Sequence, residues 1–163
     1  DLMRYEILHD VGGFIPEADS LCLRPTDELW TEPNLYTVYE NEEKKPGLVS
    51  PFLASTPKHP YLDAILKRIV RRNAPETLGA PWWAVGNKFL KRALATQPAD
   101  AVTIFPSHYF IPKHKDSPRY DGDGPVYCDQ FWGSTLHRYE KPEGVDIEAL
   151  RKDHIAILEA KLT

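Results

Sequence analysis

The first 19 residues hold the pattern that most constrains how this chain can fold. Residues 2–11 repeat apolar side chains at three-residue spacing, which is typical of one face of an amphipathic helix. Two glycines at 12–13 end that pattern, because glycine accepts the left-handed conformation in which many helices stop. Residues 14–15 then predict a short buried strand. This strand would deliver two acidic side chains, Glu17 and Asp19, to its end.

Strand-like and helical segments alternate along the rest of the chain. Strand patterns lie at 35–39, 48–54, 102–105 and 126–131, and helical patterns lie at 60–72, at 87–95 and after Asp146. The apolar stripe expected in the first of these helices consists of Leu62, Ile65, Leu66, Ile69 and Val70. Asn87 is expected to cap the second helix. This alternation predicts an α/β layered fold, and the chain length predicts a single domain spanning 1–163.

Charge and composition exclude several classes of protein. The net charge of −4 argues against a general binder of nucleic acid or of anionic membranes, which would carry a basic surplus. No apolar run is long enough to span a bilayer. The two cysteines, Cys22 and Cys128, allow one disulfide but no disulfide framework, so the cellular compartment stays open.

The acid pair is the first candidate site. Two carboxylates as close as Glu17 and Asp19 repel each other unless a cation or protons lie between them. Hard oxygen ligands of this kind suit Mn²⁺ or Mg²⁺. The alternative is a solvated acidic turn, but the preceding Gly-Gly and two apolar residues favour a cation site. Asp1 and Arg4, taken alone, are most simply a helix cap and its neighbour.

The opening segment resembles the DXD-containing sugar transferases, a family that includes fungal initiating mannosyltransferases and bacterial capsular polysaccharide glycosyltransferases. The resemblance rests on the string Asp1-x-x-Arg4-Tyr5-x-x-Leu8-x-x-x-Gly12-Gly13-Phe14-x-x-Glu17-x-Asp19. Weaker matches follow in the expected order at 25–29, 54–60, 79–81, 105–112 and 132–134. The resemblance thus covers most of residues 1–135.

The resemblance implies a GT-A type fold and a metal-dependent glycosyltransferase. Such an enzyme would move a sugar from a nucleotide-sugar donor to a hydroxyl of a glycan, lipid-linked or protein acceptor, with retention of configuration. It implies that Asp1 and Arg4 contact the donor sugar and phosphates. It also implies that Asp19 ligates Mn²⁺ or Mg²⁺, and that Glu17 assists and faces the ribose or sugar. No covalent nucleophile is assigned.

The GT-A fold normally begins with strands that hold the nucleotide base, and no residue stands before Asp1 in this sequence. We therefore expect an N-terminally truncated catalytic domain that binds a donor weakly on its own. A fungal-like protein would act in the Golgi lumen, and a bacterial-like one in the cytoplasm or at a membrane surface.

Three positions depart from the family pattern. Glu17 replaces the usual Asp, Pro51 stands where an Asn is common, and Gln130 begins the pair that replaces a late His-His. Asp129 or His137 are the alternative late metal ligands.

Two other functions remain open. The departures keep open a non-catalytic carbohydrate-binding or assembly module with the same fold. The hypothesis of a glycoside hydrolase is less well supported, because carboxylates one residue apart cannot easily flank a sugar from two sides. The pair Trp82-Trp83 is either core packing, which we favour, or a platform on which a sugar stacks.

Overall fold

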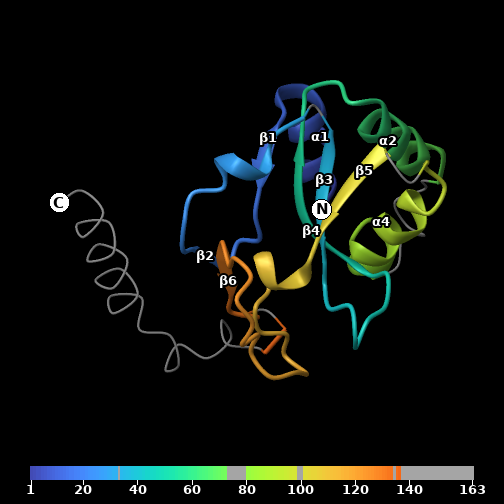
Figure 1. Ribbon diagram of the computed structural model, residues 1–163. Helices are drawn as coiled ribbons and strands as arrows, with labels where there is room; N and C mark the ends of the chain where they lie inside the picture. Colours follow the sequence, from blue (N-terminus) through green and yellow to red (C-terminus); the bar gives the residue numbers. More distant parts are fainter. Residues whose placement is uncertain (33, 73–79, 99–100, 134, 137–163) are drawn as a thin grey trace. The chain divides into compact units, whose positions relative to one another are not determined.

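The computed structural model describes residues 1–32, 34–72, 80–98, 101–133 and 135–136 (Figure 1). The chain divides into two compact units, Asp1–Gln130 and Phe131–Thr163. All the helices and strands described below belong to the first unit. In the second unit, the N–H of Leu136 donates to the carbonyl of Trp132 (2.8 Å) and closes a turn.

The first unit alternates short helices and strands. They are α1 (Leu2–Val11), β1 (Gly13–Ile15), β2 (Ser20–Cys22), η1 (Asp27–Leu29), β3 (Leu35–Tyr39), β4 (Val49–Ser55), α2 (Pro60–Arg72), α3 (Pro81–Ala84), α4 (Asn87–Leu94), β5 (Val102–Phe105), η4 (Ser107–Tyr109) and β6 (Cys128–Gln130). The predicted helices at 2–11, 60–72 and 87–95 are confirmed, as are the strands at 14–15, 35–39, 48–54 and 102–105. The last predicted strand is shorter than expected, and β2, α3 and both 3-10 turns were not predicted. The helix expected after Asp146 lies outside the described residues.

A mixed four-stranded sheet with the order β1-β4-β3-β5 forms the centre of the first unit. β4 pairs antiparallel with both β1 and β3, whereas β3 and β5 run parallel. β2 and β6 form a separate antiparallel ribbon. The fold is therefore mixed α/β, in agreement with the sequence prediction of an α/β class.

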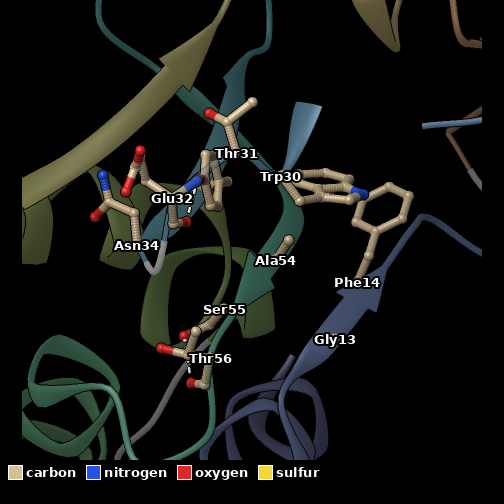
Figure 2. A pocket seen from close by; sticks show the side chains of 10 residues that line it. Gly13, Phe14, Trp30, Thr31, Glu32, Asn34, Ala54, Ser55 and Thr56 are labelled. Carbon is tan, nitrogen blue, oxygen red and sulfur yellow. Dashed lines mark hydrogen bonds between the residues drawn. The ribbon is translucent and has the colours of Figure 1, made fainter. Parts of the chain in front are cut away.

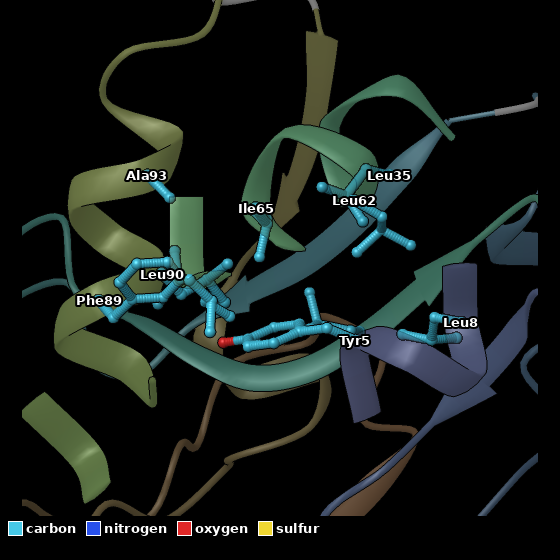
Figure 3. Packing of buried hydrophobic residues seen from close by; sticks show 11 residues of the cluster. Tyr5, Leu8, Leu35, Leu62, Ile65, Phe89, Leu90 and Ala93 are labelled. Atoms are coloured by element: carbon cyan, nitrogen blue, oxygen red, sulfur yellow. The ribbon is translucent and has the colours of Figure 1, made fainter. Parts of the chain in front are cut away.

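The helices α1, α2 and α4 pack on one face of the sheet (Figure 3). Tyr5 and Leu8 of α1 are fully buried there, and the Tyr5 ring lies 6.4 Å from the ring of Phe89. The predicted stripe of α2 is only partly right, because Val70 is 75% exposed. The N-cap position of α4 is Gly86, so the prediction that Asn87 caps this helix is wrong.

Aromatic side chains cover the opposite face of the sheet. The rings in contact there come from Phe14, Trp30, Tyr36, Phe52, Phe105 and Phe110. Strand alternation explains the division, because neighbouring strand residues point to opposite faces. In β1, for example, Phe14 joins the aromatic layer while Ile15 packs on the helical core.

The turn between α1 and β1 needs its glycines. Gly12 has φ +73° and ψ −166°, so its φ is positive as expected but it is not in the left-handed helical conformation. A Cβ at this position would lie 2.7 Å from Cδ of Pro57 and 2.9 Å from the carbonyl of Ser55. The close approach sets β1 directly beside the end of β4, and this placement positions the residues that follow β1.

Among the described residues, we find no helix with the length and apolar character needed to cross a membrane.

Candidate functional site

Arg4 is the centre of a polar cluster at the exit of β1. Its Nη1 donates to Oε1 of Glu17 (3.1 Å) and to the carbonyl oxygen of Pro51 (2.5 Å). Oδ1 of Asp1 lies 3.7 Å from the same nitrogen, because residues three apart share a side of the helix. The Arg4 side chain is only 14% exposed and that of Glu17 23%. The structure therefore brings Asp1, Arg4 and Glu17 together, although 12 residues separate Arg4 from Glu17 along the chain.

The first turn of α1 is held by the segment between α3 and α4. The hydroxyl of Tyr5 donates to the carbonyl of Val85 (2.7 Å). Oδ2 of Asp1 lies against Gly86, at 2.9 Å from where a Cβ would stand. Asp1 occupies the N-cap position of α1, but its carboxylate makes no capping hydrogen bond. The simple interpretation of Asp1 as a side-chain cap is therefore wrong.

Asp19 has a different partner from Glu17. Nε2 of Gln130 donates to Oδ1 of Asp19 (2.5 Å), and the hydroxyl of Ser20 donates to Oε1 of Gln130 (2.9 Å). This contact follows from the ladder between β2 and β6, in which Ser20 is directly opposite Gln130. The sequence singled out Gln130 only as a departure from a family pattern and not as a neighbour of Asp19.

Asp129, one of the two alternative late ligands, does not join this cluster. Asp129 points to the other side of β6 from Gln130, since strand side chains alternate. Its Oδ2 accepts a hydrogen bond from Nη1 of Arg119 (2.8 Å). His137 lies outside the described residues.

The carboxylate oxygens of this cluster are ligands of the kind that a hard cation prefers, but they are few. Over the described ranges, no three His, Cys, Asp or Glu side chains gather closely enough to hold a metal ion together. Glu17 and Asp19 nevertheless supply two carboxylates close along the chain. Magnesium is commonly held by one or two carboxylates, with waters and substrate phosphates completing its coordination. In the structure, however, Glu17 accepts a hydrogen bond from Arg4 and Asp19 accepts one from Gln130.

All three positions that depart from the family pattern contact an expected site residue. Glu17 and the Pro51 carbonyl accept hydrogen bonds from Arg4, and Gln130 donates to Asp19. The Pro51 contact uses a main-chain oxygen, so it does not depend on the side chain at that position. The departures thus lie inside the candidate site.

The two tryptophans of α3 are not core residues. Trp82 is 54% exposed and Trp83 is 53% exposed, so the core interpretation favoured from the sequence is wrong. The guanidinium of Arg92 covers one face of Trp83 at 4.5 Å. The backbone of Trp82 packs directly against Gly86, the residue beside Asp1. The exposed indoles therefore belong to the same helix junction that holds the N-terminal turn of α1.

A pocket that sequence reasoning missed lies at the other end of β1 (Figure 2). It has a volume of about 470 Å³ and is walled by the rings of Phe14, Trp30 and Tyr36. Figure 2 shows Phe14 and Trp30 side by side, with ring centroids 5.0 Å apart. The pocket opens near Gly13, whereas the acid pair follows Ile15, so it is separate from the Arg4 cluster.

Comparison of the chain with family models, with curated proteins and with solved structures finds no match.

Proposed function

We propose that this protein is a metal-dependent glycosyltransferase that moves a sugar from a nucleotide-sugar donor to an acceptor hydroxyl. The observation that supports it is the convergence of Arg4 with Asp1 and Glu17 at a strand exit. An arginine between carboxylates, at the positive end of a helix, suits a ligand that carries both hydroxyls and phosphates. The resemblance of residues 1–19 to sugar transferases assigns the same residues to donor binding.

Arg4 would bind the donor with the part of its guanidinium that faces away from its present partners. Within the described part of the chain, its two hydrogen bonds both use Nη1, and its buried Nε has no hydrogen-bond partner there. The rest of the planar fork can donate to phosphate or sugar oxygens. The Pro51 carbonyl holds the guanidinium in place, and Asp1 would accept hydrogen bonds from sugar hydroxyls.

Asp19 and Glu17 would hold the divalent cation. A bound Mn²⁺ or Mg²⁺ would neutralise the charge that develops on the departing diphosphate. To reach a cation, the Asp19 carboxylate must exchange its hydrogen bond from Gln130 for a metal bond. The exposed indoles of Trp82 and Trp83 would offer a surface on which sugar rings stack.

A second candidate function is a non-catalytic carbohydrate-binding or assembly module. It is favoured by the way in which the site residues satisfy one another: Glu17 is paired with Arg4, and Asp19 accepts from Gln130. In such a module these contacts would persist when sugar is bound, and no nucleotide would be released.

The test is Mn²⁺-dependent release of nucleotide by the full chain from a panel of nucleotide sugars, with and without acceptor glycans. Asp19→Asn should abolish release while leaving the melting temperature close to that of the unaltered chain. Asp129→Asn is the matched control, because Asp129 faces Arg119 and lies on the other side of β6. Equal activity in Asp19→Asn would refute the metal assignment. Glycan binding without any nucleotide release would instead support the non-catalytic module.

A further inference from the structure

The ribbon of β2 and β6 places the two cysteines of the chain directly opposite each other. The register pairs Cys22 with Cys128, although roughly 100 residues lie between them. Both are free thiols here, with Cys22 exposed and Cys128 buried. Side chains directly opposite in an antiparallel pair lie on the same face of the ribbon. The two sulfurs therefore share one side of it.

The hydrogen bonds of the ribbon identify which kind of pair this is. The N–H of Leu23 donates to the carbonyl of Tyr127 (2.8 Å), so Leu23 and Tyr127 form a hydrogen-bonded pair. Such pairs alternate with non-hydrogen-bonded ones along an antiparallel ladder, which makes Cys22 and Cys128 a non-hydrogen-bonded pair. The Cα atoms of that kind of pair are about 4.5 Å apart. A disulfide accepts Cα separations of about 4.4–6.8 Å.

We infer that Cys22 and Cys128 are a disulfide site that ties β2 to β6 when the protein meets a disulfide oxidant. The bond would join the two strands two residues away from Ser20 and Gln130. It would thereby fix the register that sets Gln130 beside Asp19. The inference concerns only the ribbon and does not depend on the proposed transferase activity.

The environments of the two sulfurs set the order of the reaction. Burial, with smaller contributions from the nearby Cys22 and Asp129, raises the pKa of the Cys128 thiol to about 12. Cys22 is exposed and therefore meets the oxidant first. Its thiolate attacks a small disulfide such as oxidised glutathione, forms a mixed disulfide and expels one glutathione thiolate. Cys128 then loses its proton, its Sγ attacks Sγ of Cys22, and the second glutathione leaves as a thiol.

The electrons and protons of this exchange balance. Two protein thiols are oxidised to one disulfide, and one molecule of oxidised glutathione is reduced to two thiols. Closing a loop of roughly 100 residues removes much of the freedom of the unfolded chain. For a chain of this length we therefore expect the melting temperature to rise on the order of 10 °C.

The experiment is to incubate the chain with a mixture of oxidised and reduced glutathione and then to block free thiols with N-ethylmaleimide under denaturing conditions. Non-reducing peptide mass mapping should show one peptide that contains both Cys22 and Cys128, with no maleimide on either. The melting temperature should rise, and dithiothreitol should reverse the rise. Cys22→Ser is the control, because the exposed site tolerates serine, and it should abolish both effects.

Three results would overturn the inference. The first is a stable mixed disulfide at Cys22 with Cys128 still open to maleimide after unfolding. The second is a dimer of two chains joined through Cys22. The third is an internal cross-link that leaves the melting temperature unchanged or lowers it, since that bond would not fit the native ladder.

Discussion

Replacing Gly12 with alanine is expected to destabilise the first unit strongly. Gly12 has φ +73° and ψ −166°, a conformation that L residues other than glycine rarely adopt. Backbone strain of this kind costs about 1–3 kcal/mol. A Cβ there would also lie 2.7 Å from Cδ of Pro57, 2.9 Å from its nitrogen and 2.9 Å from the Ser55 carbonyl. None of these atoms is the end of a flexible side chain, so the backbone must move.

Forcing an extra carbon into a packed site costs about 1–3 kcal/mol more. The sum for Gly12→Ala is about 2–6 kcal/mol, which corresponds to a drop in melting temperature on the order of 10 °C in a chain of this length. Gly13→Ala is the matched control. Its φ is +101°, but no atom lies within 4 Å of the new Cβ, so only the backbone strain applies. We expect a loss of about 1–3 kcal/mol for this variant.

Urea and thermal unfolding followed by circular dichroism measure both variants. Gly12→Ala should be less stable than Gly13→Ala by about 2 kcal/mol. Equal losses would show that β1 does not approach the end of β4 as closely as described. The placement of Glu17 beside Arg4 would then be in doubt as well, because Glu17 follows β1 directly.

Four further outcomes are expected. Arg4→Lys keeps the charge but loses the forked guanidinium. The rate of nucleotide release should fall on the order of tenfold or more, which corresponds to one lost charged hydrogen bond. The free energy of unfolding should fall by about 1 kcal/mol, since Arg4 also holds the Pro51 carbonyl. Melting curves and initial rates measure the two effects separately. If Arg4→Lys lowers the melting temperature without lowering the rate of nucleotide release, Arg4 has a structural role only. Trp82→Ala should raise the KM for a glycan acceptor while changing stability by less than about 0.5 kcal/mol, because the indole is half exposed; a large drop in melting temperature would contradict that exposure. Maleimide at neutral pH should label Cys22 and spare Cys128, because burial keeps the Cys128 thiol protonated until the pH approaches its pKa of about 12. Because the pKa of Cys128 is raised in the folded state, the protonated thiol should contribute to the stability of the fold below about pH 9, and this contribution should be lost as the pH rises toward 12. A Cys128→Ala variant should lack that part of the pH dependence of stability.

Local pattern was enough to predict most of the helices and strands. The helices α2 and α4 follow from apolar side chains at helical spacing, and the buried residues Leu62 and Ile65 lie on the face predicted for α2. The strand β3 follows from a run of β-branched and aromatic residues. Such patterns can be recognised from neighbouring residues alone, because they depend only on which face of a single helix or strand is buried. They fail at element ends, where Val70 is exposed although it continues the stripe.

The candidate site could be predicted only in part. The resemblance of residues 1–19 implied one donor site for Asp1, Arg4, Glu17 and Asp19, and the structure brings the first three of these together. No pattern in the sequence indicated that the Pro51 carbonyl would hold Arg4. That contact spans 47 positions and depends on the pairing of β1 with β4.

Only the tertiary structure decided what surrounds Asp19 and the cysteines. Gln130 reaches Asp19 across 111 positions, through a ribbon whose strands are three residues long. Strands this short carry too little periodicity to reveal their partner or their register. The same register sets Cys22 opposite Cys128, and a shift of one residue would have moved every side chain to the other face. The sequence by itself therefore determined most of the helices and strands and placed two acidic residues after β1, while long-range strand pairing decided which polar groups and thiols meet.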